Sequence, residues 1–303
     1  MHAAIQLLAP GDQLVACGDV YGGTYRLIDQ LVKPMGVDIV WVDMCDATAV
    51  QDSMSDRTKM LWIETPTNPL LRVFDMEALS ALARTRGALC VVDSTFATPL
   101  LQRPLELGVD IVVHSMSKYL NGHSDVVAGV VISNTDEVGD QLRFIQRAGG
   151  AVPSPFDCYL VARGIKTLPL RMARHCDSAQ ALAAWLRQQN GVVAVHYPGL
   201  EDHPGHEVAA RQMSGFGGMV SFEVAGGVER ARAVLRRVRL FSLAESLGGV
   251  ESLIGQPALM SHASMPKEVR EAQGIRDGLI RVSVGLEDIE DLQEDLAQAL
   301  FTP

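Results

Sequence analysis

The chain has 303 residues, 48% of them hydrophobic, which is enough apolar material for one large domain or two domains of ordinary size. It carries 26 basic and 36 acidic side chains, and its formal net charge is −10. Nucleic acids and anionic membranes are bound by basic faces, so this charge predicts neither of them as a partner.

The five cysteines are widely spaced and form no Cys-x-x-Cys pair, which predicts neither a metal site nor a redox pair. An odd number at such spacing favours a reducing compartment, so we expect a cytoplasmic protein. No apolar run approaches the about 20 residues that a transmembrane helix requires. Residues 1–10 lack the charged flank and the cleavage site of a signal peptide.

The first half of the chain alternates short apolar runs with helical patterns. We expect strands at residues 13–17, 38–42, 60–64, 88–93, 110–114 and 126–132. We expect helices at residues 24–31, 46–53, 75–86 and 135–147, after a short helical segment at residues 3–8. This alternation predicts a mostly parallel sheet with helices on both faces, and such sheets bind ligands at the carboxyl ends of their strands. Glu64, Asp93 and His114 fall at those ends.

The second half has a different pattern. A helical pattern follows Ser154 and runs to about residue 189, and Gly164 and Pro169 are candidate interruptions. Further strands are expected at residues 192–196, 218–224 and 279–284, and helices at residues 228–237 and 288–300. We interpret this part as a smaller α/β domain and expect the two domains to span residues 1–175 and 176–303. Residues 197–205 and 262–274 show the least regular pattern.

One lysine and one carboxylate follow two of the expected strands. Lys118 lies just past an apolar run and beside Ser115 and Ser117, and Asp93 ends the previous apolar run. This arrangement suits pyridoxal phosphate (PLP): the lysine forms a Schiff base, the carboxylate keeps the ring nitrogen protonated, and the hydroxyls bind the phosphate. Taken singly, the same residues also fit a surface lysine, a helix cap and turn serines.

Three further side chains have patterns that suit such a site. Tyr21 precedes a Gly-rich turn and could stack on a flat ring, or it could simply cover the core. Asn68 lies in a loop fixed by prolines and could donate to the ring's phenolic oxygen, or it could belong to a rigid turn. Arg281 lies within an apolar strand, where its charge requires a partner. A substrate carboxylate and an internal salt bridge fit equally well.

Ordered motifs along nearly the whole chain resemble the PLP-dependent transsulfuration enzymes, the group of cystathionine γ-synthases, γ-lyases and β-lyases. The motifs are DVYGGTYRL, WIETPTNPLLRV, VVDSTFATPLLQRPLELGVDIVVHSMSKYLNGHSDV, SPFDCYLVARGIKTLPLRM, RQMSGFGGMVSFEV, AESLGGVESLI, SHASMP and GIRDGLIRVSVGLEDIEDL. The resemblance implies an α/β fold of the PLP-dependent transferase kind (aspartate aminotransferase-like, fold type I), with a mostly parallel sheet and a smaller C-terminal α/β domain.

The resemblance also implies roles for the cofactor-binding residues. Lys118 matches the lysine of the internal aldimine, and Asp93 matches the partner of the pyridine nitrogen. Tyr21 matches the ring-stacking tyrosine and is a candidate proton donor in catalysis. Ser115 and Ser117 match the phosphate-binding hydroxyls, although the family usually has threonine where Ser117 stands.

Other residues match the substrate-binding positions of the family. Asn68 matches the asparagine near the cofactor oxygen and the substrate carboxylate. Arg281 matches the clamp for the α-carboxylate, assisted by the region of Ser246. Glu245 belongs to a segment that resembles the γ-synthases and γ-lyases, whereas the β-lyases and methionine γ-lyases usually differ there.

Family members carry a further N-terminal segment upstream of Met1, with a Ser-Gly-Met loop for the cofactor phosphate and a Tyr-x-Arg pair that reaches a neighbouring subunit. We therefore expect either a misassigned start codon or a fragment with a damaged site. The family assembles as homotetramers, dimers of dimers, and we expect the same here.

The resemblance implies chemistry at the γ-carbon of a small amino-acid substrate. A γ-synthase joins an acylated homoserine to cysteine, and a γ-lyase cleaves cystathionine to cysteine, 2-oxobutanoate and ammonia. An O-acetylhomoserine sulfhydrylase, a methionine γ-lyase and a non-catalytic fragment remain as alternatives.

Overall fold

A six-stranded sheet is built from the first half of the chain. The computed structural model describes residues 1–263, 265 and 267–301. The strand order is β2-β1-β3-β4-β5-β6, and every neighbouring pair is parallel except β5 and β6. The strands are β1 (Gln13–Cys17), β2 (Asp38–Val42), β3 (Thr58–Glu64), β4 (Leu89–Asp93), β5 (Ile111–Ser115) and β6 (Gly129–Ser133). The predicted mostly parallel sheet is confirmed.

Helices cover this sheet, and polar caps begin several of them. Asp46 accepts hydrogen bonds from the Thr48 and Ala49 N–H groups in the first turn of α3, and Asp75 accepts one from the Ala78 N–H in the first turn of α4. The helices are α1 (His2–Ile5), α2 (Gly22–Leu27), α3 (Ala47–Ser53), α4 (Met76–Thr85), α5 (Thr98–Leu101), α6 (Asp136–Gly149) and α7 (Pro155–Ile165). Two predicted extents are wrong: α1 stops at residue 5, and α2 gives way to a π-helical turn at Ile28–Val32. The strand predicted from residue 126 begins only at residue 129.

A second, five-stranded sheet forms the rest of the molecule, in the order β7-β8-β11-β10-β9. Its strands are β7 (Val192–His196), β8 (Met219–Val224), β9 (Ser242–Leu243), β10 (Leu253–Gly255) and β11 (Leu279–Ser283). Its helices are α8 (Leu168–Leu186), α9 (His206–Gln212), α10 (Gly227–Arg237), α11 (Lys267–Ala272) and α12 (Ile289–Phe301). The sequence analysis missed β9, β10, α9 and α11. Within the irregular stretch 262–274, residues 264 and 266 lie outside the described residues.

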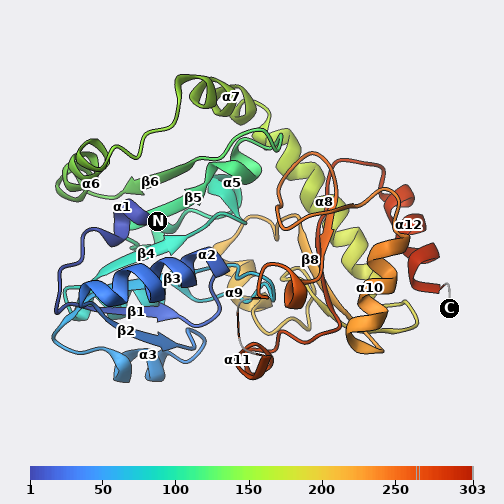
Figure 1. The fold of residues 1–303 in the computed structure, drawn as a ribbon, viewed down its shortest axis with the longest axis horizontal. Helices are drawn as coiled ribbons and strands as arrows, with labels where there is room; N and C mark the ends of the chain where they lie inside the picture. Colours follow the sequence, from blue (N-terminus) through green and yellow to red (C-terminus); the bar gives the residue numbers. More distant parts are fainter. Residues whose placement is uncertain (264, 266, 302–303) are drawn as a thin grey trace.

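Figure 1 shows the first sheet on the left and the second on the right, with α8 crossing from one towards the other. The predicted domain boundary at residues 175 and 176 falls inside α8 and stays a prediction. Each sheet has its own hydrophobic core, and a third cluster contains residues from both halves. The buried members of this junction cluster are Leu71, Phe96, Tyr119, Leu120, Leu168, Met172, Met219 and Leu247. Tyr119 follows Lys118 directly, so the lysine lies where the two halves meet.

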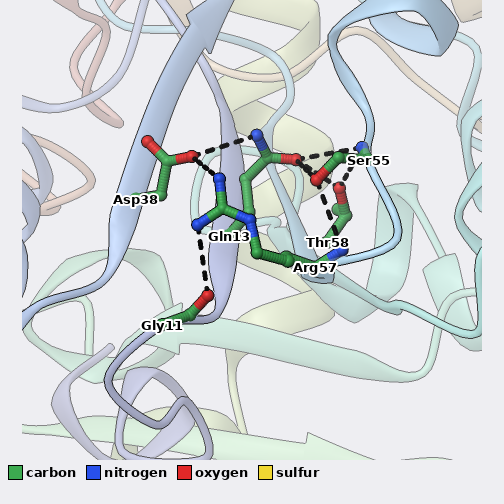
Figure 2. A network of polar contacts seen from close by, with 6 residues as sticks. All are labelled: Gly11, Gln13, Asp38, Ser55, Arg57 and Thr58. Atoms are coloured by element: carbon green, nitrogen blue, oxygen red, sulfur yellow. Dashed lines mark hydrogen bonds and ion pairs between the residues drawn. The ribbon is translucent and has the colours of Figure 1, made fainter.

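The amino ends of β1, β2 and β3 are tied together by a polar network (Figure 2). The Gln13 side-chain oxygen accepts hydrogen bonds from the Ser55 backbone N–H at 3.1 Å and from the Thr58 hydroxyl. The Arg57 Nη2 donates to Asp38 Oδ2 at 2.9 Å. This network lies at the opposite end of the strands from Glu64 and Asp93, so its role is structural.

Replacing Gln13 by leucine tests this assignment. The substitution leaves buried donors without their acceptor, and we expect the free energy of unfolding to fall by about 1–3 kcal/mol. Urea denaturation of the wild type and of Gln13→Leu measures the loss. The catalytic constants of the folded variant should match those of the wild type, and a changed KM would contradict the structural role.

Candidate active site

The turn after β5 presents the candidate lysine. Residues Met116–Leu120 form a π-helical turn, and Lys118 has non-helical dihedrals inside it (φ −105°, ψ −137°). Its Nζ donates to Ser246 Oγ at 3.0 Å. Burial, and secondly the positive charge of Arg281, lower the pKa of Lys118 from 10.5 to about 8. About a tenth of the amine is therefore neutral at pH 7, and only the neutral form can attack an aldehyde.

A glycine allows the loop that carries Ser246 to approach the lysine turn. Gly248 has a φ of +75°, and a Cβ there would lie 2.7 Å from the Tyr119 backbone nitrogen. The Gly248 N–H donates to Ser283 Oγ on β11 at 2.8 Å. These contacts hold Ser246 beside Lys118 and attach its loop to the second sheet.

Asp93 ends β4 and is 8% exposed. Its Oδ1 accepts from the Thr95 backbone N–H at 3.0 Å and from the Thr95 hydroxyl at 2.5 Å. The Thr95 oxygen in turn accepts from the Ser115 backbone N–H at 2.9 Å. Thr95 therefore fixes the orientation of the carboxylate and leaves Oδ2 outside these bonds. The sequence analysis missed Thr95, although a threonine two residues after an aspartate is typical of such turns.

Arg281 on β11 is 4% exposed and is held by neutral acceptors. Its Nη1 donates to Asn68 Oδ1 at 3.0 Å, and its Nη2 donates to the carbonyls of Glu245 at 2.7 Å and Ser246 at 3.0 Å. Burial lowers the pKa of Arg281 to about 10. No described carboxylate forms a salt bridge with it, so the internal salt bridge is not the arrangement adopted, and a substrate carboxylate remains the candidate partner. Glu245 contributes its backbone here, and its side chain is exposed.

The remaining predicted residues lie around this centre. Tyr21 is the residue before α2, and its side chain is 43% exposed. The Ser117 hydroxyl accepts from the Ala128 backbone N–H at 3.0 Å and donates to the Ala128 carbonyl at 3.3 Å. Ser115 contributes its backbone to Thr95, as described above. Phosphate binding by Ser115 and Ser117 stays a prediction.

The site residues fit the predicted cofactor by their chemistry. A buried amine with a lowered pKa suits an aldehyde, and a buried carboxylate with an oxygen outside its fixing bonds suits a pyridinium nitrogen. A half-exposed tyrosine ring suits stacking, and a buried guanidinium with neutral partners suits a carboxylate. Together with the α/β fold, these groups define a class: an enzyme that processes amino acids on an aldehyde cofactor carried by a lysine.

Comparison with known proteins gives the same class. A model of the family described as "Cys/Met metabolism PLP-dependent enzyme" matches residues 1–301. The chain belongs to this family and is a PLP-dependent enzyme of the transsulfuration type, as the sequence predicted.

Individual relatives carry the names of different reactions. The chain is 49% identical over 298 residues to a cystathionine β-lyase of Coxiella burnetii, covering 98% of this chain and 77% of that protein. It is 50% identical over 294 residues to a cystathionine γ-synthase of Mycobacterium tuberculosis, covering 97% and 75%. The crystal structure of a cystathionine γ-lyase from Lactobacillus plantarum complexed with L-serine has a TM-score of 0.96 at 43% identity, covering 98% and 78%. These matches confirm the predicted fold class.

The lowered pKa of Lys118 makes a pH prediction. The neutral amine fraction should rise about tenfold per pH unit below about pH 8 and level off above it. Trace acetylation of the cofactor-free protein, followed by mass spectrometry of the peptide that contains residue 118, measures this fraction. Exposed Lys59 serves as the internal reference. Labelling of Lys118 that still climbs tenfold between pH 9 and pH 10 would contradict the prediction.

Proposed function

We propose that the protein acts at the γ-carbon of a small amino-acid substrate, as a cystathionine γ-synthase or γ-lyase. One observation carries the proposal: the loop at residues 245 and 246 accepts hydrogen bonds from both Lys118 and Arg281. The same loop therefore holds both the Lys118 amine, which is suited to moving protons, and the Arg281 guanidinium, which is suited to binding a carboxylate. An amino acid held by its carboxylate at Arg281 would have its α-carbon close to the Lys118 amine.

The residues of the chain would divide the work as follows. Arg281 and Asn68 bind the α-carboxylate, and Asp93 holds a proton on the ring nitrogen. Bound PLP supplies an electron sink for charge that develops on the amino-acid carbons. Lys118 would hold PLP between turnovers, and its freed amine would take the α-proton, pass it on and then take a proton from the β-carbon, so that the γ-substituent can leave. Tyr21 is the candidate proton donor to the group that leaves the γ-carbon.

Glu245 supports γ-chemistry over β-chemistry, because its segment resembles the γ-enzymes. Sequence identity over the whole chain does not distinguish β-chemistry from γ-chemistry, because a β-lyase matches this chain at 49% and a γ-synthase at 50%. Purified protein supplied with O-succinylhomoserine and cysteine tests the synthase, and cystathionine alone tests the lyase. Cystathionine formation, or release of 2-oxobutanoate, supports the proposal. Release of pyruvate from cystathionine would show cleavage at the β-carbon and overturn it.

We propose a homotetramer built from two dimers. Large apolar side chains stand exposed on and beside α6 and α7, which lie along the upper edge of the molecule in Figure 1: Phe144 at 66%, Phe156 at 67%, Tyr159 at 59% and Leu170 at 76%. Exposed large apolar side chains are typical of a surface covered by another subunit. Light scattering should give the mass of four chains, and a monomer would contradict the proposal.

We also propose that the enzyme works in the cytoplasm. All five cysteines are free in the structure, and Cys45 and Cys158 are exposed, which favours a reducing compartment. Among the described residues, no helix is both long and apolar enough to cross a membrane.

A further inference from the structure

A second buried carboxyl group lies beside Asp93 and has no part in the scheme above. Glu64 ends β3, is paired in register with Asp93 of β4, and is 5% exposed. Its Oε2 accepts a hydrogen bond from the Tyr21 backbone N–H at 2.8 Å. The backbone of Asn68, four residues further along the chain, also interacts with this carboxyl group and favours its charged form. Glu64 thus joins the two loops that carry Tyr21 and Asn68.

We propose that Glu64 is a positioning residue, which fixes Tyr21 through the hydrogen bond from its backbone N–H and fixes Asn68 through the interaction of its backbone with the same carboxyl group. The inference rests on the roles proposed for those two residues. Glu64 touches neither the substrate carboxylate nor the ring nitrogen in this scheme. It acts through the loops that do.

The position of the Tyr21 ring depends on the conformation of its backbone and of the turn that follows it. The ring folds over the following turn, because a Cβ at Gly23 would lie 2.3 Å from Tyr21 Cε1. A Cβ at Gly22 would lie 2.8 Å from the Ser261 carbonyl oxygen, so the turn is pressed against the second half of the molecule. Because Tyr21 is 43% exposed, packing restrains its ring only in part. The hydrogen bond to Glu64 is therefore a principal restraint on its direction.

The surroundings of Glu64 favour its neutral form. Burial, then the neighbouring charge of Asp93, raise the pKa of Glu64 well above its usual range, and Asp19 adds to the effect. The backbone groups of Tyr21 and Asn68 oppose this shift without cancelling it. A neutral acid still accepts the hydrogen bond from the Tyr21 N–H and adds no second negative charge beside Asp93. Glutamine has the same shape and also accepts hydrogen bonds, whereas leucine accepts none.

The experiment compares Glu64→Gln with Glu64→Leu. We expect Glu64→Leu to weaken PLP binding to the cofactor-free protein about tenfold and to lower kcat/KM by about 10–100-fold, because the part-buried backbone N–H of Tyr21 loses its acceptor. Glu64→Gln should stay within about threefold of the wild type in both measurements. The circular dichroism of the bound cofactor's visible band should change in Glu64→Leu and not in Glu64→Gln.

Two controls separate positioning from general destabilisation. Gln13→Leu removes a buried acceptor at the far end of the same sheet, and it should lower stability without weakening PLP binding. Tyr21→Ala combined with Glu64→Leu should cost less than the sum of the single effects, because Glu64 acts through Tyr21.

Three outcomes would overturn the inference: wild-type PLP affinity in Glu64→Leu, equal damage in both Glu64 variants, or full additivity with Tyr21→Ala. PLP affinity is measured without substrate, so it also distinguishes this inference from the choice of reaction. A wild type that lacks γ-activity and still depends on Glu64 for PLP binding would reject the proposed reaction alone.

Discussion

Lys118→Ala is expected to lower kcat by roughly 10³-fold or more, because the variant loses the group that moves protons between substrate carbons. Among the described residues no other lysine is placed to substitute: the amine of Lys118 lies 3.0 Å from the Ser246 hydroxyl, and burial and the charge of Arg281 lower its pKa. The same variant should also lose the covalent attachment of PLP. Steady-state kinetics and the visible absorption spectrum measure the two effects.

Borohydride reduction identifies the residue to which PLP is covalently attached. The wild type should lose its yellow colour and carry the reduced cofactor on the peptide that contains residue 118. Lys118→Ala should carry none there. Lys59→Ala removes an exposed lysine of β3 and should behave as the wild type in both assays. If spectrum and turnover in Lys118→Ala matched those of the wild type, the assignment of this lysine would be wrong.

The sequence predicted the first sheet well because its central strands are buried on both faces. Such strands are nearly continuous apolar runs, as in β1, where every residue is buried and only Gln13 is polar, and the bounds of β1 were predicted correctly. The strands β9 and β10 are two and three residues long, and pairing with distant strands stabilises them. Neither leaves a periodic pattern in the sequence. The π-helical turn after α2 was missed because its residues are those of an ordinary helix.

Site residues could be predicted from the sequence where the residue type and its position at the end of a strand were enough to indicate the role. Lys118 and Asp93 follow apolar runs, and the topology of parallel strands brings their ends together. The partners of these residues were not predictable in the same way. Ser246 is 128 positions from Lys118, and Asn68 is 213 positions from Arg281. The sequence indicated Ser246 only through family resemblance and Asn68 only as a candidate near the cofactor, and the structure supplies the contacts.

Arg281→Met should raise the KM of the amino-acid substrate by about 10–100-fold, because the carboxylate loses a bidentate, charged donor in a buried site. Arg281→Lys keeps the charge and loses the planar fork, so it should fall between the wild type and Arg281→Met. The long apolar side chain of methionine fits the volume of the arginine, and the folded state should survive the substitution. Arg276→Met removes an exposed guanidinium and should leave KM unchanged. A wild-type KM in Arg281→Met would exclude Arg281 as the clamp.

The two variants also differ in their effect on Lys118. The positive charge of Arg281 disfavours the protonated amine and is the second cause of the lowered pKa of Lys118. Removing that charge favours the protonated form, so the pKa of Lys118 should rise in Arg281→Met, and its acetylation profile should move to higher pH. Arg281→Lys keeps a positive charge nearby and should move the profile less. A raised KM with an unmoved profile would mean that Arg281 binds the carboxylate without acting on the lysine. In Arg281→Met, we expect a raised KM together with an acetylation profile moved to higher pH. In Arg281→Lys, we expect a larger effect on KM than on the profile. These results would show that the Arg281 guanidinium both binds the carboxylate and lowers the pKa of Lys118.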